Sequence, residues 1–143
     1  MIEYQKILDK NMLNVFKDIL KNIKDNGLLN NNHLYVTFLT NHKNVELPNW
    51  LKQKYPQEMT IIIQYEYYDL EINKNDFSIT LSFGDIKTNL KINYNAIISF
   101  ADPSANFGLI LQKSNIRNKE NKKLENNKSK KDNVINFSNY KKN

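Results

Sequence analysis

The residues that could carry out chemistry are few in this 143-residue chain, and they are scattered. The absence of cysteine excludes a thiol nucleophile, a disulfide framework and a cysteine metal site. The two histidines, His33 and His42, lack the spacing of a metal site or a catalytic triad, and three glycines are too few for a glycine-rich phosphate loop. The carboxylates that lie closest together are Glu66, Asp69 and Glu71, and then Asp76 and Asp85.

These carboxylates lie on or beside predicted strands that have one exposed face. Acidic residues in that position usually keep a surface soluble and do not form an acid and base pair. We therefore expect a binding protein and not an enzyme, with no cofactor and no bound metal.

The strongest candidate for a binding site is a tight turn predicted at residues 83–86. Apolar and polar residues alternate in 77–83 and again in 90–94, which indicates two strands, each with one buried face, paired as a hairpin. Gly84 lies between these runs, where glycine adopts positive φ without a Cβ penalty. Backbone exposed beside Phe83 is suited to docking a peptide, so we expect function at this turn.

Short elements are predicted before this hairpin. Apolar residues alternate in 34–40, which indicates a strand, and Trp50 is expected to anchor a helical turn. The other predictions are an edge segment, that helical turn and a central strand, at residues 45–48, 49–55 and 60–68. Five or six short strands with regularly spaced turns favour a small mainly β barrel or sandwich for residues 28–111.

A helix is predicted at residues 4–24, within an N-terminal segment of residues 1–27 that Gly27 ends. Its apolar arc covers roughly half of the circumference, more than one small barrel usually covers. The helix therefore packs on its own barrel alone, or it also pairs with the same helix of a second subunit. The apolar residues considered for that interface are Leu8, Met12, Phe16, Ile19 and Leu20.

The C-terminal part differs in composition from the rest. From residue 113 onward ten lysines and arginines face three carboxylates, a net charge of +7, whereas residues 1–112 carry a net charge of −1. Residues 112–133 are polar and are predicted to be a disordered, flexible linker. Apolar residues return in 134–143, either by chance or as a short linear motif. That motif would comprise Val134, Ile135, Phe137, Tyr140, Lys141 and Lys142.

The segment SFGDIKTNLKINYNAIISFADPSANFGL resembles the stringent starvation protein B family, whose members are adaptors that hand tagged proteins to the ClpXP protease. The phrase FADPSANFGL is close to the alphaproteobacterial branch. Upstream, HLYVTF, VELP and YPQEMT resemble the same branch in the same order, so the resemblance covers about residues 5–111.

The resemblance implies a small SH3-like or Sm-like barrel that binds ssrA-tagged polypeptides, a helix-mediated homodimer, and a C-terminal motif, in residues 134–143, that docks on the ClpX unfoldase. Asp85 and Lys87 stand where many relatives have a second glycine and a proline. The residues implied on one side of the peptide groove are Ser82, Phe83, Gly84, Asp85, Ile86 and Lys87, and those opposite are Phe100 and Ala101.

Two other readings were weighed. A small β-barrel with a basic tail could bind RNA; against this, the tyrosines of the predicted strands are not interleaved with arginine or lysine, and the body is net acidic, so nucleic acid is not the expected partner. A purely structural dimerisation module is the third reading. No signal peptide or membrane span is predicted, so we expect a soluble cytoplasmic protein.

Overall fold

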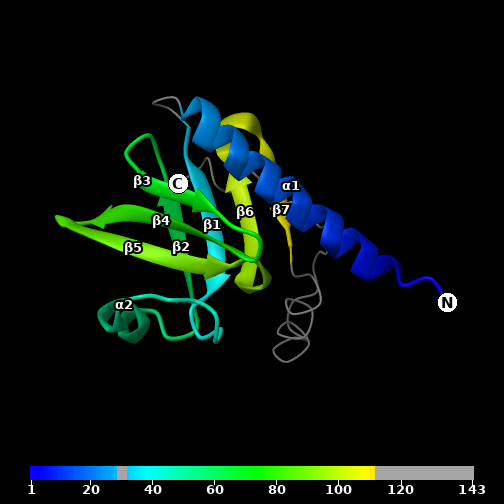
Figure 1. Ribbon diagram of the computed structural model, residues 1–143, viewed down its shortest axis with the longest axis horizontal. Coiled ribbons are helices and arrows are strands. Elements are labelled where there is room, and N and C mark those ends of the chain that lie inside the picture. The colour runs from blue at the N-terminus through cyan, green and yellow to red at the C-terminus, as the bar shows by residue number, and fades with distance from the viewer. Residues whose placement is uncertain (29–31, 112–143) are drawn as a thin grey trace, which may run out of the picture.

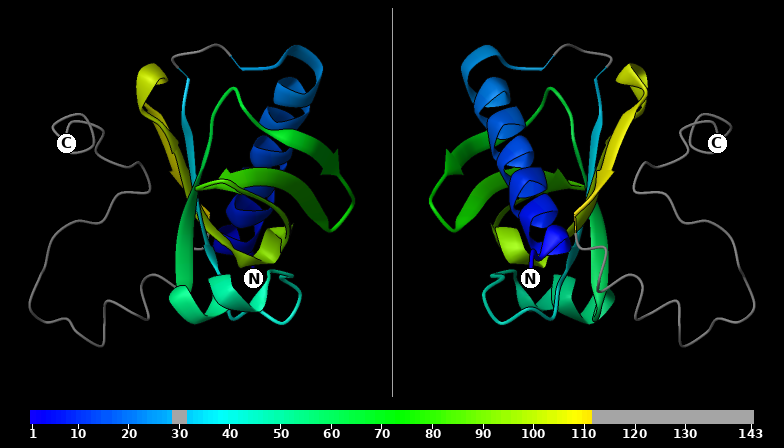
Figure 2. Two further views of the ribbon diagram at one scale, coloured as in Figure 1. Left: turned by 90° about the vertical axis from the view of Figure 1, so that its left-hand side faces the viewer. Right: turned by 90° about the vertical axis from the view of Figure 1, so that its right-hand side faces the viewer.

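The computed structural model describes residues 1–28 and 32–111, and it places one long helix against two antiparallel sheets (Figure 1; Figure 2). Helix α1 (Tyr4–Asn26) ends at Gly27, whose N–H donates to the carbonyl of Ile23 at 2.7 Å. Gly27 combines φ of 78° with ψ of −178°, a backbone conformation that is essentially restricted to glycine. The predicted helix and its end are therefore confirmed.

The larger sheet contains four strands in the order β2-β1-β6-β7, and the smaller one contains three in the order β3-β4-β5. Short helices connect them: α2 (Asn49–Lys54) precedes β2, and the 3-10 turns η1 (Tyr94–Ala96) and η2 (Pro103–Ala105) flank β6. The strands are β1 (Leu34–Leu39), β2 (Glu58–Ile63), β3 (Tyr68–Ile72), β4 (Asp76–Phe83), β5 (Ile86–Asn93), β6 (Ile97–Asp102) and β7 (Phe107–Ile110).

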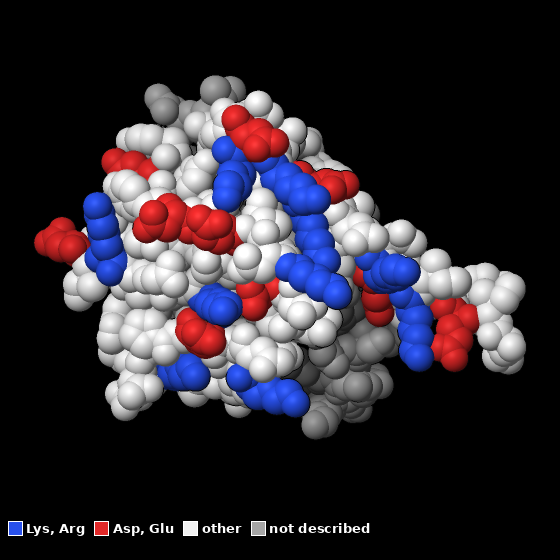
Figure 3. All heavy atoms as spheres, viewed as in Figure 1, with Lys and Arg blue, Asp and Glu red and all other residues white. Residues whose placement is uncertain are grey.

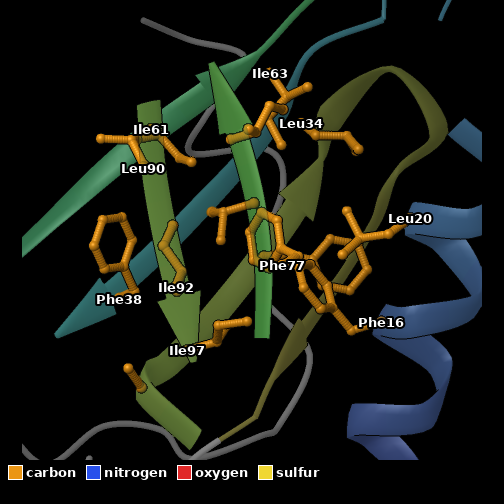
Figure 4. Packing of buried hydrophobic residues seen from close by; sticks show 14 of the residues in the cluster. Phe16, Leu20, Leu34, Phe38, Ile61, Ile63, Phe77, Leu90, Ile92 and Ile97 are labelled. Carbon is orange, nitrogen blue, oxygen red and sulfur yellow. The ribbon is translucent and has the colours of Figure 1, made fainter. Parts of the chain in front are cut away.

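The core lies between the two sheets and under α1, where every second strand residue is buried (Figure 4). Phe16 of α1 contacts one ring from each sheet: its centroid is 5.7 Å from that of Phe77 on β4 and 5.5 Å from that of Phe100 on β6. All three rings are at most 1% exposed. Each contributes about 2–3 kcal/mol by burial, so α1 holds the sheets together at this end.

The predicted fold class, mainly β with an N-terminal helix, is confirmed. Strand pairing within residues 1–28 and 32–111 gives two sheets and not one closed barrel. The prediction of a single central strand at 60–68 is wrong. β2 ends at Ile63 on the edge of the larger sheet, and the chain crosses to the smaller sheet before β3 begins at Tyr68.

Two predicted segments, the linker at 112–133 and the docking motif at 134–143, lie outside the described residues. In the described part of the chain, no helix has the length and apolar character needed to cross a membrane.

Candidate functional site

The turn between β4 and β5 has the conformation that a two-residue hairpin requires. Phe83 pairs with Ile86, so Gly84 and Asp85 form the turn. Gly84 has φ of 66°, and an added Cβ would meet nothing within 4 Å, so backbone conformation and not lack of space calls for glycine. Asp85 is not one of the described non-glycine residues with positive φ, which fits a type II′ turn with glycine at its first central position.

The hairpin divides the predicted binding residues between its two faces. Directly paired residues share a face, and the next pair along the strands points to the other face. Phe83 and Ile86 therefore lie on the face that carries buried Leu81, beyond the end of the core. Ser82 and Lys87 form the adjacent pair and lie on the outer face of the smaller sheet.

An apolar surface lies at the core-facing side of the turn. Trp50 of α2 packs edge-on against Phe83, with ring centroids 6.1 Å apart and an interplanar angle of 83°. Trp50 remains 42% exposed and Ile86 57% exposed. Exposed aromatic and aliphatic side chains in contact are typical of binding surfaces, so this cluster can cover apolar side chains of a ligand.

Helix α2 is held in place by its other side. Leu51 is buried, and the hydroxyl of Thr40 donates to the carbonyl of Tyr55 at 2.6 Å, just after the helix ends. The expectation that Trp50 anchors the helical turn is therefore wrong, because Leu51 is the anchor. A six-residue helix can bury only one side, and two adjacent apolar residues were the signal that one of them would remain exposed.

A second surface lies on the outer face, where the ammonium of Lys87 sits 4.2 Å from the centroid of the Tyr68 ring. Tyr68 is opposite Thr80 on β4 and 38% exposed, so it shares the outer face with Ser82. The cation–π contact restricts the long lysine side chain beside the turn. The sequence reasoning did not include Tyr68 in the site.

The outer edge of β5 offers backbone groups close to this turn. Glu46 exchanges two backbone hydrogen bonds with Lys91, at 2.8 and 3.1 Å, and Pro48 has no N–H with which to continue the pairing. Outward-pointing backbone groups alternate along a strand, so Asn89 and Lys87 present the next ones. These have no backbone partner among the residues that the structure describes.

Phe100 and Ala101, the two residues expected on the opposite side of the groove, are buried at 1% and 2% exposure. Phe100 contacts Phe16, which also contacts Phe77 at the start of β4. Because Phe77 and Phe83 are six residues apart on one strand, these ends are roughly 20 Å apart. The structure thus places Phe100 at the far end of β4 from the turn, and Ala101 next to it on β6.

A comparison with protein-family models decides the family. The model described as stringent starvation protein B matches residues 7–143. The chain belongs to the stringent starvation protein B family. The resemblance inferred from the sequence is therefore confirmed, and the match extends from α1 through the C-terminal residues outside the described part. A search of curated proteins found no match.

In this family member, helix α1 presents different residues to the core and to solvent. Phe16 and Leu20, both expected at a subunit interface, are fully buried in their own chain and leave no surface for a second subunit. Leu8 is 41% exposed, and Met12 and Ile19 are partly buried. The other exposed apolar side chains of α1 are Tyr4, Ile7 and Val15.

A groove of about 610 Å³ runs beside the C-terminal half of α1, away from the β4–β5 turn. Val15 and Ile19 line it from the helix, Leu34 lines it from β1, and Asp102 lies at the end of β6. The groove is continuous with the exposed apolar residues of α1, because Val15 belongs to both.

The strongest electrostatic perturbation also lies away from the turn. Burial raises the pKa of Tyr94 to about 12, and the negative charge of Asp76 adds to the effect. The phenol donates to the carbonyl of Asn73 at 2.9 Å. His42 accepts a hydrogen bond at Nδ1 from the N–H of Asn44, and no metal-binding cluster occurs among residues 1–28 and 32–111.

Proposed function

We propose that this chain is a proteolytic adaptor that binds ssrA-type degradation tags and delivers the tagged proteins to the ClpXP protease. The observation that carries the proposal is the exposed apolar surface of Trp50, Phe83 and Ile86 at the β4–β5 turn, in a member of the stringent starvation protein B family. Family membership supports an adaptor role, and the apolar surface supports peptide binding at this place.

The tag binds as an extended segment along the outer edge of β5. The outward N–H and C=O groups of Lys87 and Asn89 pair with its backbone, in line with the bonds between Glu46 and Lys91. Main-chain pairing provides affinity, and alternate side chains provide specificity. Apolar tag residues contact Trp50 and Ile86, while residues on the other side of the tag lie near the ammonium of Lys87.

Delivery rests on the C-terminal residues. In this proposal residues 134–143 dock on the ClpX unfoldase and residues 112–133 connect them to the body. A flexible connection of this length has a root-mean-square span of roughly 25 Å, so the tag is held near the unfoldase at an effective concentration on the order of millimolar. The adaptor then lowers the apparent KM for tagged substrates without performing any chemistry.

Dimerisation belongs to the same proposal, with a changed set of residues. The exposed face of α1 that includes Tyr4, Ile7, Leu8 and Val15 contacts the same face of a second subunit, and Ile19 contributes at its border. Phe16 and Leu20 act from the core side by holding the helix in place. Two subunits then offer two C-terminal motifs to one unfoldase ring.

The test is fluorescence anisotropy of a labelled peptide carrying the ssrA-type tag, titrated with the full chain at physiological salt. A scrambled peptide of the same composition is the control. Saturable binding of the tag alone supports the proposal. Equal binding of both peptides, or binding of neither, would reject it.

A further inference from the structure

All five lysines of α1 lie on one narrow strip of its surface. At about 100° per residue, Lys6, Lys10, Lys17, Lys21 and Lys24 fall within an arc of about 60°, and no other residue of the helix does. The strip is about 27 Å long from Lys6 to Lys24, at about 1.5 Å per residue. Figure 3 shows a row of blue side chains that follows the helix toward its N-terminal end. We call these five residues the lysine strip.

The lysine strip is separate from the other two faces of α1. The core face, which carries Phe16 and Leu20, borders it on one side. The exposed apolar face, which includes Leu8 and Val15, is centred roughly 150° away around the helix. Pairing of α1 with a second copy through the apolar face would therefore leave the lysine strip exposed.

The strip has more positive charge than nearby carboxylates neutralise. At its ends Lys6 pairs with Glu3 at 3.1 Å and Lys24 with Glu71 at 3.5 Å, and these exposed pairs contribute little. Lys10 and Lys21 make no ion pair with a residue that the structure describes.

The middle of the strip is also held in position. The ammonium of Lys17 donates to the carbonyl of Lys74 at 3.2 Å and lies 4.6 Å from the centroid of the Tyr94 ring. The β3–β4 turn thereby brings Lys74, a further lysine, close to the strip. Asp18 and Asp25 lie on the neighbouring side of the helix, so the charge is concentrated along one line and not spread over the surface.

We propose that the lysine strip binds the phosphate backbone of single-stranded RNA. A row of point charges on a straight rod matches a flexible strand that can lie along it, with one phosphate at each ammonium. Half of the circumference of α1 is packed on the sheets, so the helix cannot enter a duplex groove, and the strip has no aromatic residue to read bases. The contact therefore positions the strand without selecting its sequence.

This surface fits other anionic partners less well. A protein interface has an apolar centre, and the strip contains lysine alone. A membrane surface would require apolar side chains pointing the same way as the lysines, whereas those of α1 point to another side. The proposal does not depend on the tag site, because the strip and the β4–β5 turn share no residue.

The test compares two charge-matched variants of the full chain. In the first, Lys6→Gln, Lys10→Gln and Lys21→Gln remove three exposed lysines of the strip; glutamine keeps the helix propensity. In the second, Lys128→Gln, Lys130→Gln and Lys131→Gln remove the same charge from the C-terminal part. Each is titrated into a labelled single-stranded RNA of about 20 nucleotides, from about 50 to 200 mM salt, with melting curves recorded for both.

The expected result follows from counterion release. Three lost phosphate contacts lower the slope of log K against log salt by about 2, which corresponds to an affinity loss of about 100-fold near 0.1 M salt. The C-terminal variant should keep a slope closer to that of the unmodified chain. Equal losses for the two variants, no RNA binding by the unmodified chain, or tighter binding of duplex DNA, anionic vesicles or polyglutamate would overturn the proposal.

Discussion

Replacing Trp50 with alanine should weaken tag binding while leaving the fold in place. Trp50 is 42% exposed, which for a side chain of roughly 250 Å² leaves about 100 Å² for a peptide to cover. At about 25 cal/mol per Å² this area contributes about 2.5 kcal/mol, or about 70-fold in affinity if it is fully covered. Partial coverage lowers the effect, so we expect a loss between about 10-fold and 70-fold.

The assay is anisotropy of the labelled tag peptide with Trp50→Ala, Trp50→Phe and Ile62→Ala. The phenylalanine variant keeps an aromatic ring against Phe83 and should lose less than the alanine variant. Ile62 on β2 is a matched control, because it is 40% exposed and faces away from the core on the larger sheet. Circular dichroism and melting curves identify any variant that does not fold.

A loss below threefold for folded Trp50→Ala would refute this reasoning, as would an equal loss for Ile62→Ala. The unmodified chain offers an independent check, because Trp50 is its single tryptophan. Peptide that covers this ring should shift its emission to shorter wavelength. An unchanged emission spectrum at saturating peptide would place the tag elsewhere.

Three further predictions follow from the proposals and the core. Deleting residues 134–143 should leave tag affinity unchanged and abolish the stimulation of degradation by purified ClpXP; retained stimulation would exclude a docking role for these residues. The double variant Ile7→Asp and Leu8→Asp should be monomeric by analytical ultracentrifugation with a melting temperature close to that of the unmodified chain, and a dimer of unchanged affinity would rule out this face. Because the folded chain holds the Tyr94 proton more tightly than the unfolded chain, stability should fall between pH about 10 and about 12, where only the unfolded phenol is largely ionised. Urea unfolding of Tyr94→Phe should lack this component, and identical pH profiles would contradict the assignment.

Local patterns were sufficient to predict the β4–β5 hairpin and α1. Strict alternation across residues 77–83, with Gly84 between two apolar runs, specifies both the strands and the turn. The prediction at 60–68 failed because that stretch contains β-branched and aromatic residues throughout and no glycine or proline. The chain nevertheless changes sheets there, and Asp69, with φ of 54°, lies where the register of β3 shifts.

The candidate site was predictable only where neighbouring residues formed it. Phe83 and Ile86 follow from the turn, but the contact with Trp50 depends on how α2 packs against a different sheet. Periodicity alone also could not assign the apolar residues of α1 to the core or to an interface, because both faces are apolar. Contact with Phe77 and Phe100 assigns Phe16 to the core.

The position of Phe16 between the two sheets makes α1 part of one cooperative folding unit with the strands. Removing residues 1–27 would leave a gap of several large side chains between the sheets, so the body should not persist as an independent fragment. Subunit association through α1 would then be thermodynamically linked to folding, and apparent stability would rise with protein concentration. Substitutions on the inner side of this helix would alter folding, association and ligand binding together, whereas those on its two outer sides would separate them.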